Sequence, residues 1–283
     1  MTKRALVLGG GAAKGAFQAG VIYRLAQEHS WDIVSGVSVG AINGACIAMY
    51  DSKNVKIAVD RLVEYWKYNL NNDKVFKKWI PIDWLNYPIA YFKNGLYNFT
   101  PLKNFLTSRI DINALKTSDV DYIIGATSFN DGTFKQATKT NAKIIDWILA
   151  SASFPMAFPP VTIDGKQYID GALRNSVPIR EAIRAGATEI DVVITDPLGF
   201  HKKENKKPNN ILDIFLRTSE IISDESYVYE LQKICAQYNV KITVYSPKEY
   251  LTNEPLDFSQ KEILKLLEIG LQEVDVWEYP SKS

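Results

Sequence analysis

The stretch Ile33-Val34-Ser35-Gly36-Val37-Ser38-Val39-Gly40 decides the fold class of this chain. Its apolar, β-branched start predicts a buried strand, and the small and apolar residues 41–49 that follow predict a helix. A serine between two glycines at a strand-to-helix turn is typical of a nucleophile elbow, which lifts the Ser38 hydroxyl to the N-terminus of the helix. Such a tight turn leaves no room for a Cβ at Gly36 or Gly40. The pattern also arises by chance, so a plain glycine-rich turn remains an alternative.

Length and composition restrict the class of protein. The chain has 283 residues, 46% of them hydrophobic, which suits one large α/β domain or two small ones with a sizeable core. A formal net charge of +1 gives no overall attraction for nucleic acid. The two cysteines, Cys46 and Cys235, form no disulfide framework or metal-ligand spacing, so we expect a reducing compartment and no metal.

From the sequence at the N-terminus we expect no secretory signal peptide. The apolar run at 5–8 is too short for a signal peptide, and no cleavage site follows it. No apolar run approaches the roughly 20 residues of a membrane span. We therefore expect a cytoplasmic protein.

The first part of the chain alternates strands and helices. We predict a strand at 4–8, a helix at 16–28, a strand at 32–37 and a helix at 39–50, and this order favours a parallel sheet with right-handed crossovers. Apolar residues at helical spacing, followed by aromatic residues interrupted by prolines, predict a helical insertion over the sheet at about 54–110.

The remainder of the chain continues in a similar way. Further strands are expected at 121–127, 133–137, 167–170, 189–195 and 240–245, and helices at 141–152, 178–185, 211–238 and 258–271. We interpret 1–283 as a single domain with its motifs in 5–195 and a C-terminal helical extension at about 205–283.

A second glycine cluster, Gly9-Gly10-Gly11-Ala12-Ala13-Lys14-Gly15, lies between the first strand and the first helix. A dinucleotide-binding loop would need a glycine where Lys14 or Ala12 stands, and a P-loop would need Ser or Thr where Gly15 stands. The alternative is an oxyanion hole, because glycine amides at a helix N-terminus favour a developing negative charge. If the first two strands are neighbours, both glycine loops emerge at the same sheet edge, next to Ser38. Lys14 would then reinforce the positive field, or it is simply a solvated lysine.

A nucleophilic serine needs a base, and the chain has few candidates. His29 lies at the far end of the second strand, and His201 opens a charged loop. Asp170 ends a predicted strand and is followed by Gly171, which permits a sharp turn. A partly desolvated carboxylate bound to the serine hydroxyl can act directly as the base. An Asp-Gly hairpin turn is the alternative for Asp170 alone.

Five blocks of sequence together resemble the patatin-like phospholipase family. They are Gly10-Gly11-Ala12-Ala13-Lys14-Gly15, Gly36-Val37-Ser38-Val39-Gly40, Ala150-Ser151-Ala152-Ser153-Phe154-Pro155 with Phe158-Pro159-Pro160-Val161, Asp170-Gly171-Ala172 and Asn175-Ser176-Val177-Pro178. They occur in the order of the family across residues 5–195. The insertion and the residues after 195 resemble nothing as clearly.

The resemblance implies an α/β fold, a three-layer α/β/α sandwich with a mainly parallel central sheet. It also implies a serine lipid acyl hydrolase, of the phospholipase A or lysophospholipase type, which needs no cofactor. Its substrate would be a lipid or another ester, and a transient contact with a membrane surface is a further expectation. Two alternatives stay open, a nucleotide-binding α/β protein and a lipid-binding module without catalysis.

The resemblance assigns Ser38 as nucleophile, Asp170 as base, and the amides of Gly10, Gly11 and Ala12 as the oxyanion hole. The residues that support these motifs are Gly9, Lys14, Gly15, Gly36, Gly40, Gly171 and Ala172. Ala12 stands where the family has a third glycine. Its amide serves if φ is negative there, whereas a positive φ would cost about 1 kcal/mol.

The insertion contains a dense aromatic segment at 79–99. Its aromatic residues are Trp79, Trp84, Tyr87, Tyr91, Phe92, Tyr97 and Phe99. Two interpretations are open: an interfacial lid or acyl-pocket wall, and an aromatic core beneath a cap.

Overall fold

The computed structural model describes residues 2–81, 83–198 and 211–280. A central sheet runs through it in the order β11-β10-β9-β1-β2-β5-β8-β7, with β6 also paired to β5. These strands are β1 (Arg4–Leu8), β2 (Ile33–Gly36), β5 (Asp121–Ser128), β6 (Phe134–Thr138), β7 (Val161–Ile163), β8 (Lys166–Asp170), β9 (Glu189–Val193), β10 (Lys241–Pro247) and β11 (Val274–Tyr279).

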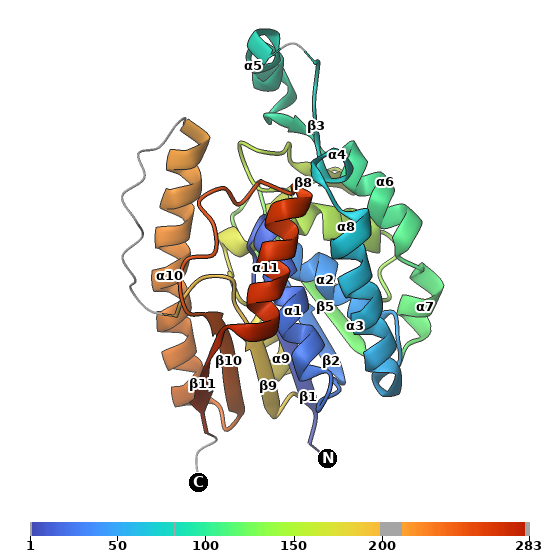
Figure 1. Ribbon diagram of the computed structural model, residues 1–283, viewed down its shortest axis with the longest axis vertical. Helices are drawn as coiled ribbons and strands as arrows, with labels where there is room; N and C mark the ends of the chain where they lie inside the picture. Colours follow the sequence, from blue (N-terminus) through green and yellow to red (C-terminus); the bar gives the residue numbers. More distant parts are fainter. Residues whose placement is uncertain (1, 82, 199–210, 281–283) are drawn as a thin grey trace.

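Helices cover both faces of the sheet, so the predicted three-layer α/β/α sandwich is confirmed (Figure 1). Side chains alternate between the faces along β1: Leu6 and Leu8 pack on one face, Ala5 and Val7 on the other. The first face is covered by α1 (Gly15–Leu25), α2 (Val39–Ala48), α3 (Val55–Glu64), α8 (Ile144–Ser151) and α11 (Gln260–Gln272). The second is covered by α9 (Ile179–Arg184) and α10 (Ile211–Gln237).

The middle of the sheet is parallel, as predicted. β1 lies between β2 and β9 and runs parallel to both, and β5 and β10 extend the parallel part on either side. The edges are antiparallel: β8 and β6 run opposite to β5, and β11 runs opposite to β10. Consequently the loops after β1 and β2 emerge at the same edge, while β8 brings Asp170 to that edge from the opposite direction.

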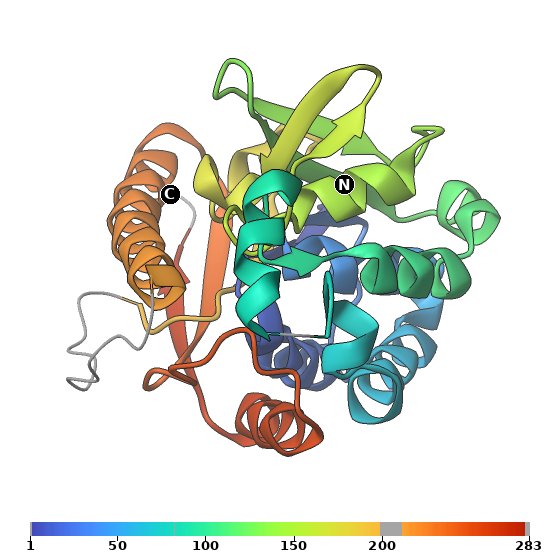
Figure 2. The same ribbon diagram turned by 90° about the horizontal axis from the view of Figure 1, so that it is seen from above.

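The insertion is mainly helical, as expected, with a small ribbon that the sequence did not predict. After α3 come a short π-helix (Tyr65–Asn69), α4 (Asn72–Val75), β3 (Lys77–Lys78), α5 (Asp83–Lys93), β4 (Tyr97–Asn98), α6 (Thr100–Arg109) and α7 (Ile112–Thr117). β3 and β4 pair antiparallel and carry α5 between them. Viewed from above, α5 lies over the middle of the molecule (Figure 2).

The C-terminal region is not the helical extension that the sequence predicted. The predicted strand and helices are present as β10, α10 and α11, but β11 was missed, and both strands join the central sheet. β11 is an edge strand with residues 276–278 exposed, so its apolar content gave little signal of a buried element. No helix of the described residues has the length and apolar character needed to cross a bilayer.

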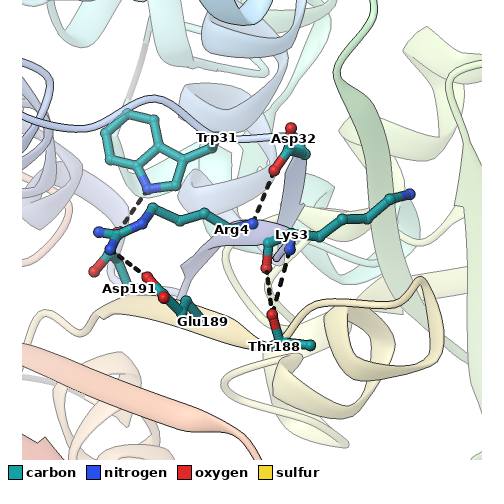
Figure 3. Close-up of polar contacts among 7 residues, drawn as sticks. All are labelled: Lys3, Arg4, Trp31, Asp32, Thr188, Glu189 and Asp191. Carbon is teal, nitrogen blue, oxygen red and sulfur yellow. Dashed lines mark hydrogen bonds and ion pairs between the residues drawn. The ribbon is translucent and has the colours of Figure 1, made fainter. Parts of the chain in front are cut away.

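A polar network ties the sheet together at the end where β1 begins (Figure 3). The carboxylate of Asp191, which is buried, accepts hydrogen bonds from Trp31 Nε1 at 2.8 Å and from Arg4 Nη1 at 3.2 Å. Arg4 also pairs with Glu189, and its backbone amide donates to Asp32 Oδ2 at 2.8 Å. The network joins β1 to β9 and to the start of β2, at the opposite end of β1 from the glycine loop.

Candidate active site

The strand, turn and helix predicted around Ser38 are present. Ser38 follows β2 and caps α2, with φ 55° and ψ −130°, a conformation that costs a non-glycine residue energy and occurs mainly at functional sites. A Cβ on Gly36 would lie 2.4 Å from the carbonyl oxygen of Gly40, and one on Gly40 would lie 2.4 Å from that of Leu8. The two glycines therefore allow both the sharp turn and its close approach to the end of β1.

Asp170 lies directly against Ser38. It is the last residue of β8, and its Oδ2 accepts a 2.7 Å hydrogen bond from Ser38 Oγ. Its Oδ1 accepts from the amide of Ala172 at 2.8 Å, which fixes the carboxylate plane. Gly171 is required beside it, because a Cβ there would lie 2.2 Å from the carbonyl oxygen of Gly125. The structure thus brings the two predicted residues into direct contact.

Burial changes the acidity of this carboxyl. Asp170 is only 1% exposed, and desolvation raises its pKa from 3.8 to about 7. The hydrogen bonds from the Ala172 amide and the Ser38 hydroxyl act in the opposite direction, because they stabilise the charged form. A carboxylate with a pKa near neutrality is a far stronger base than an exposed aspartate, while it is still ionised in a large fraction of molecules at neutral pH.

The first glycine loop lies beside the same hydroxyl. A Cβ on Gly10 would lie 3.3 Å from Cβ of Ser38 and 3.1 Å from Cβ of Ala172. Within the described part of the chain, the amides of Gly10 and Gly11 have no hydrogen-bond acceptor. Ala12 has φ 51°, so the condition of a negative φ is not met and the substitution carries the strain estimated from the sequence.

Two side chains that the sequence did not single out hold the carbonyl groups of this loop. Gln18 Nε2 donates to the carbonyl oxygen of Gly9 at 2.8 Å, and Thr195 Oγ1 donates to that of Gly10 at 2.7 Å. Gln18 lies one turn into α1, and Thr195 follows β9. No motif marks either residue, because their contacts depend on how α1 and β9 pack beside the loop.

Lys14 is neither solvated nor an isolated positive charge. It is 4% exposed, and its Nζ lies 2.7 Å from Asp196 Oδ1 and 3.9 Å from Glu220 Oε1. Asp196 follows β9 and Glu220 lies on α10, so Lys14 anchors the glycine loop to the C-terminal part of the chain. The two nearby carboxylates offset its charge, and the predicted reinforcement of a positive field is correspondingly reduced.

The block at 150–155 supports both sides of the site. Ser151 Oγ accepts a 2.9 Å hydrogen bond from the amide of Ser38 and donates to the carbonyl oxygen of Gly125 at 2.6 Å. The carbonyl oxygen of Ser153 accepts from the amide of Asp170 at 3.0 Å. These contacts explain why the block accompanies the elbow and the aspartate, a role that the motif alone did not reveal.

Ser38 and Asp170 lie in the wall of a largely apolar cavity of about 190 Å³. Its apolar walls come from the insertion, from the segment between α8 and β7, from α10 and from the loop before α11. They include Trp66, Leu70, Phe99, Phe158, Leu216 and Phe258. A cavity of this character suits an apolar chain better than a polar nucleotide.

Residues of the aromatic segment at 79–99 differ in their environment, and no single interpretation, pocket wall, lid or buried core, covers all of them. Phe99 lines the cavity and stacks on Phe158, with ring centroids 3.9 Å apart. Tyr91 and Phe92 are instead 80% exposed. The side chains of Trp84 and Tyr87 lie outside the described residues.

Of the two histidines considered as a base, only His29 lies among the described residues. The Asp170 carboxylate accepts hydrogen bonds from Ser38 Oγ and from the Ala172 amide. His29 lies in the loop between α1 and β2, near the start of β2. His201 lies outside the described residues.

Comparison with known proteins adds independent evidence. A sequence model of the patatin-like phospholipase family matches residues 6–183. Lysophospholipase NTE1 of Meyerozyma guilliermondii is 25% identical over 201 residues, which cover 66% of this chain and 12% of that protein. The uncharacterized protein YjjU of Escherichia coli (strain K12) is 27% identical over 199 residues, 68% of this chain and 52% of that protein. The crystal structure of VipD from Legionella pneumophila aligns with a TM-score of 0.43 and 15% identity, over 98% of this chain and 68% of that one. The chain thus spans only part of the length of these relatives.

Proposed function

Because the chain belongs to the patatin-like phospholipase family, we propose that it is a serine hydrolase of lipid carboxylic esters. The observation that carries the proposal is the hydrogen bond of 2.7 Å from Ser38 Oγ to Asp170 Oδ2 in the wall of an apolar cavity. The apolar lining of the cavity supports a substrate with an acyl chain, of the lysophospholipase or phospholipase A type, and the first of these agrees with the name of the fungal relative. The cytoplasmic location expected from the sequence stays a prediction.

In the proposed reaction Asp170 is the general base. It takes the hydroxyl proton as Ser38 Oγ forms a bond to the ester carbonyl carbon, and then delivers this proton to the departing alcohol oxygen. The resulting acyl-enzyme is cleaved by water, whose proton again passes to Asp170 while its oxygen bonds to the acyl carbon. Ser38 Oγ then leaves and recovers the proton.

The amides of Gly10 and Gly11, with Ala12 as the third member, are the proposed oxyanion hole. In a trans peptide the N–H points away from the preceding C=O. Since Gln18 and Thr195 bind the carbonyl groups of Gly9 and Gly10, the amides of Gly10 and Gly11 face away from these two side chains. Preorganised donors of this kind stabilise the charge that develops on the carbonyl oxygen.

Labelling with a fluorophosphonate tests the proposal directly, because this probe bonds covalently to an activated serine. We expect intact-mass spectrometry to show one adduct on the wild-type chain and none on Ser38→Ala, together with hydrolysis of a soluble short-chain ester by the wild type alone. A labelled Ser38→Ala variant, or one that still hydrolyses esters, would exclude the mechanism.

The same experiment addresses the two alternatives. A nucleotide-binding protein or a lipid-binding module without catalysis would show no adduct on Ser38. Neither alternative gives a reason for a buried carboxylate held against a serine hydroxyl, which is why the hydrolase is favoured.

A further inference from the structure

Helix α5 presents two adjacent aromatic side chains to solvent. It extends beyond the rest of the molecule at the end toward which β1 and β2 run (Figure 1). Tyr91 and Phe92, in its last turn, are each 80% exposed, and their rings make an edge-on contact with centroids 5.4 Å apart. Single exposed apolar residues are common, but two adjacent exposed aromatic rings on a helix that projects from the molecule indicate an interaction surface.

These two rings are not needed to hold α5 in place. The helix is attached through Asn86, which accepts from the amide of Trp79 at 2.9 Å and donates to the carbonyl oxygen of Leu96 at 3.2 Å. Trp79 Nε1 donates to the carbonyl oxygen of Gly95 at 2.8 Å. The packing of α5 therefore gives no reason for the aromatic character of positions 91 and 92.

The base of α5 is directly connected to the wall of the cavity. The amide of Leu96 donates to the carbonyl oxygen of Met156 at 2.8 Å, and that of Tyr97 donates to that of Ala157 at 2.9 Å. The next residue, Phe158, lines the cavity that contains Ser38. Tyr91 and Phe92 directly precede this attachment in the chain, so a surface that contacts them lies on the same side of the molecule as the cavity.

The segment that carries the two rings has a net positive charge. Between residues 76 and 98 the chain has three lysines, Lys77, Lys78 and Lys93, and one acidic residue, Asp83. Lys77, Lys78 and Lys93 are exposed, and Lys93 Nζ lies 5.7 Å from the ring of Trp79. Aromatic rings flanked by lysines suit the boundary between apolar chains and anionic headgroups.

We propose that Tyr91 and Phe92 dock the protein on a lipid surface that contains anionic headgroups, with the lysines of the β3–α5–β4 segment facing those headgroups. The proposal rests on the proposed function in one respect, since docking there would present lipid esters on the side of the molecule that holds Ser38. It adds to that function the partner, a lipid bilayer, and the residues that recognise it.

Vesicle co-sedimentation tests the proposal. The probes are vesicles of equal parts phosphatidylcholine and phosphatidylglycerol, and vesicles of phosphatidylcholine alone. We expect the wild type to bind the mixed vesicles, and Tyr91→Ser/Phe92→Ser to bind them about tenfold more weakly or less, because the two rings no longer enter the interface. Lys77→Glu should weaken binding to the mixed vesicles only, and added salt should reduce that part of the affinity.

Ile57→Ser is the matched control. Ile57 is 53% exposed on the first turn of α3. Helix α3 begins near the opposite end of the molecule from α5 (Figure 1). This variant should bind vesicles as the wild type does, and thermal unfolding should show that the double variant remains folded. Equal vesicle binding by the double variant and the wild type would overturn the proposal, as would an equal loss in Ile57→Ser.

Soluble substrate separates docking from catalysis. The double variant should hydrolyse a short-chain soluble ester as fast as the wild type while losing hydrolysis of vesicle lipid. A wild type that docks through the two rings but hydrolyses neither substrate would refute the proposed function and leave the docking intact. Self-association that the double variant abolishes, without any binding of vesicles, would instead identify a second copy of the chain as the occupant.

Discussion

The Oγ atom of Ser38 lies 2.7 Å from Oδ2 of Asp170, although the two residues are 132 positions apart in the chain. Ser38 follows β2 and Asp170 ends β8, and β5 lies between these strands in the sheet. Because β2 and β5 are parallel and β8 is antiparallel to β5, the end of β2 and the end of β8 do not lie at the same sheet edge by strand direction alone. They meet because β5 extends past β2 and pairs with β8 over Ala126–Ser128.

The pH dependence of activity should follow the ionisation of Asp170. Burial raises its pKa to about 7, and only the ionised form accepts the serine proton. We expect kcat/KM for a soluble ester to rise about tenfold per pH unit below about pH 7 and to level off above it. An activity that is already constant from about pH 5 upward would contradict the raised pKa of Asp170.

Asp170→Asn should strongly reduce activity but increase stability at alkaline pH. The variant keeps the shape of the side chain and loses the base, so we expect a decrease in kcat of about 10²–10⁴.

In the wild type the folded chain retains a proton that the unfolded chain loses between pH 3.8 and about 7, so the free energy of unfolding falls as pH rises through this window. Asparagine has no such titration. Urea unfolding should therefore show the variant to be more stable at about pH 8, by about 4 kcal/mol at most, with the difference shrinking toward about pH 4. Equal stability differences at both pH values would contradict the raised pKa.

Thr195→Val should impair the oxyanion loop without disrupting the pair of Ser38 and Asp170. The change removes the donor to the Gly10 carbonyl oxygen and keeps most of the volume of the side chain. We expect kcat to fall about 10–100-fold, with little change in KM, because the amides are held less well for the transition state. Thr195→Ser, which retains the hydroxyl, is the control and should recover most of the activity. A rise in KM at unchanged kcat would instead indicate a role in substrate binding.

Asp191→Ala should reduce stability and leave the specific activity of the folded protein unchanged. It removes a buried carboxylate that accepts hydrogen bonds from Trp31 and Arg4 (Figure 3). Asp191 pairs with Leu6 in the sheet, three residues before the glycine loop begins at Gly9. Loss of one member of a buried network commonly costs about 3–5 kcal/mol, and we expect a loss of that order in denaturant unfolding. A selective loss of kcat with unchanged stability would show that this network influences the site.

The order of strands and helices could be predicted from the sequence because the pattern is strong in most elements. β1 and β2 are largely apolar and each runs into a glycine turn, and α2 is built mainly of small and apolar residues. The prediction failed for β11 and for the β3–β4 ribbon. Both pair at the periphery, where exposed residues carry little hydrophobic pattern and the partner strand alone determines pairing.

The sequence also indicated the reacting residues of the site, but not the side chains that hold the glycine loop in place. Glycines, a serine and an aspartate in recognisable turns suffice to nominate Ser38, Asp170 and the loop at Gly10. Thr195 carries no such signal, because a hydroxyl that binds one carbonyl oxygen is indistinguishable from any other threonine until the fold places it there.

The sequence by itself determined which turns are sharp, since only glycine fits beside the backbone at positions such as Gly36 and Gly40. Tertiary structure alone decided the environment of Asp170. Its neighbours exclude water from the carboxyl, and the ionised form therefore loses solvation free energy, which raises the pKa of Asp170. A local sequence pattern does not reveal this shift, because the residues that bury the carboxyl come from distant parts of the chain.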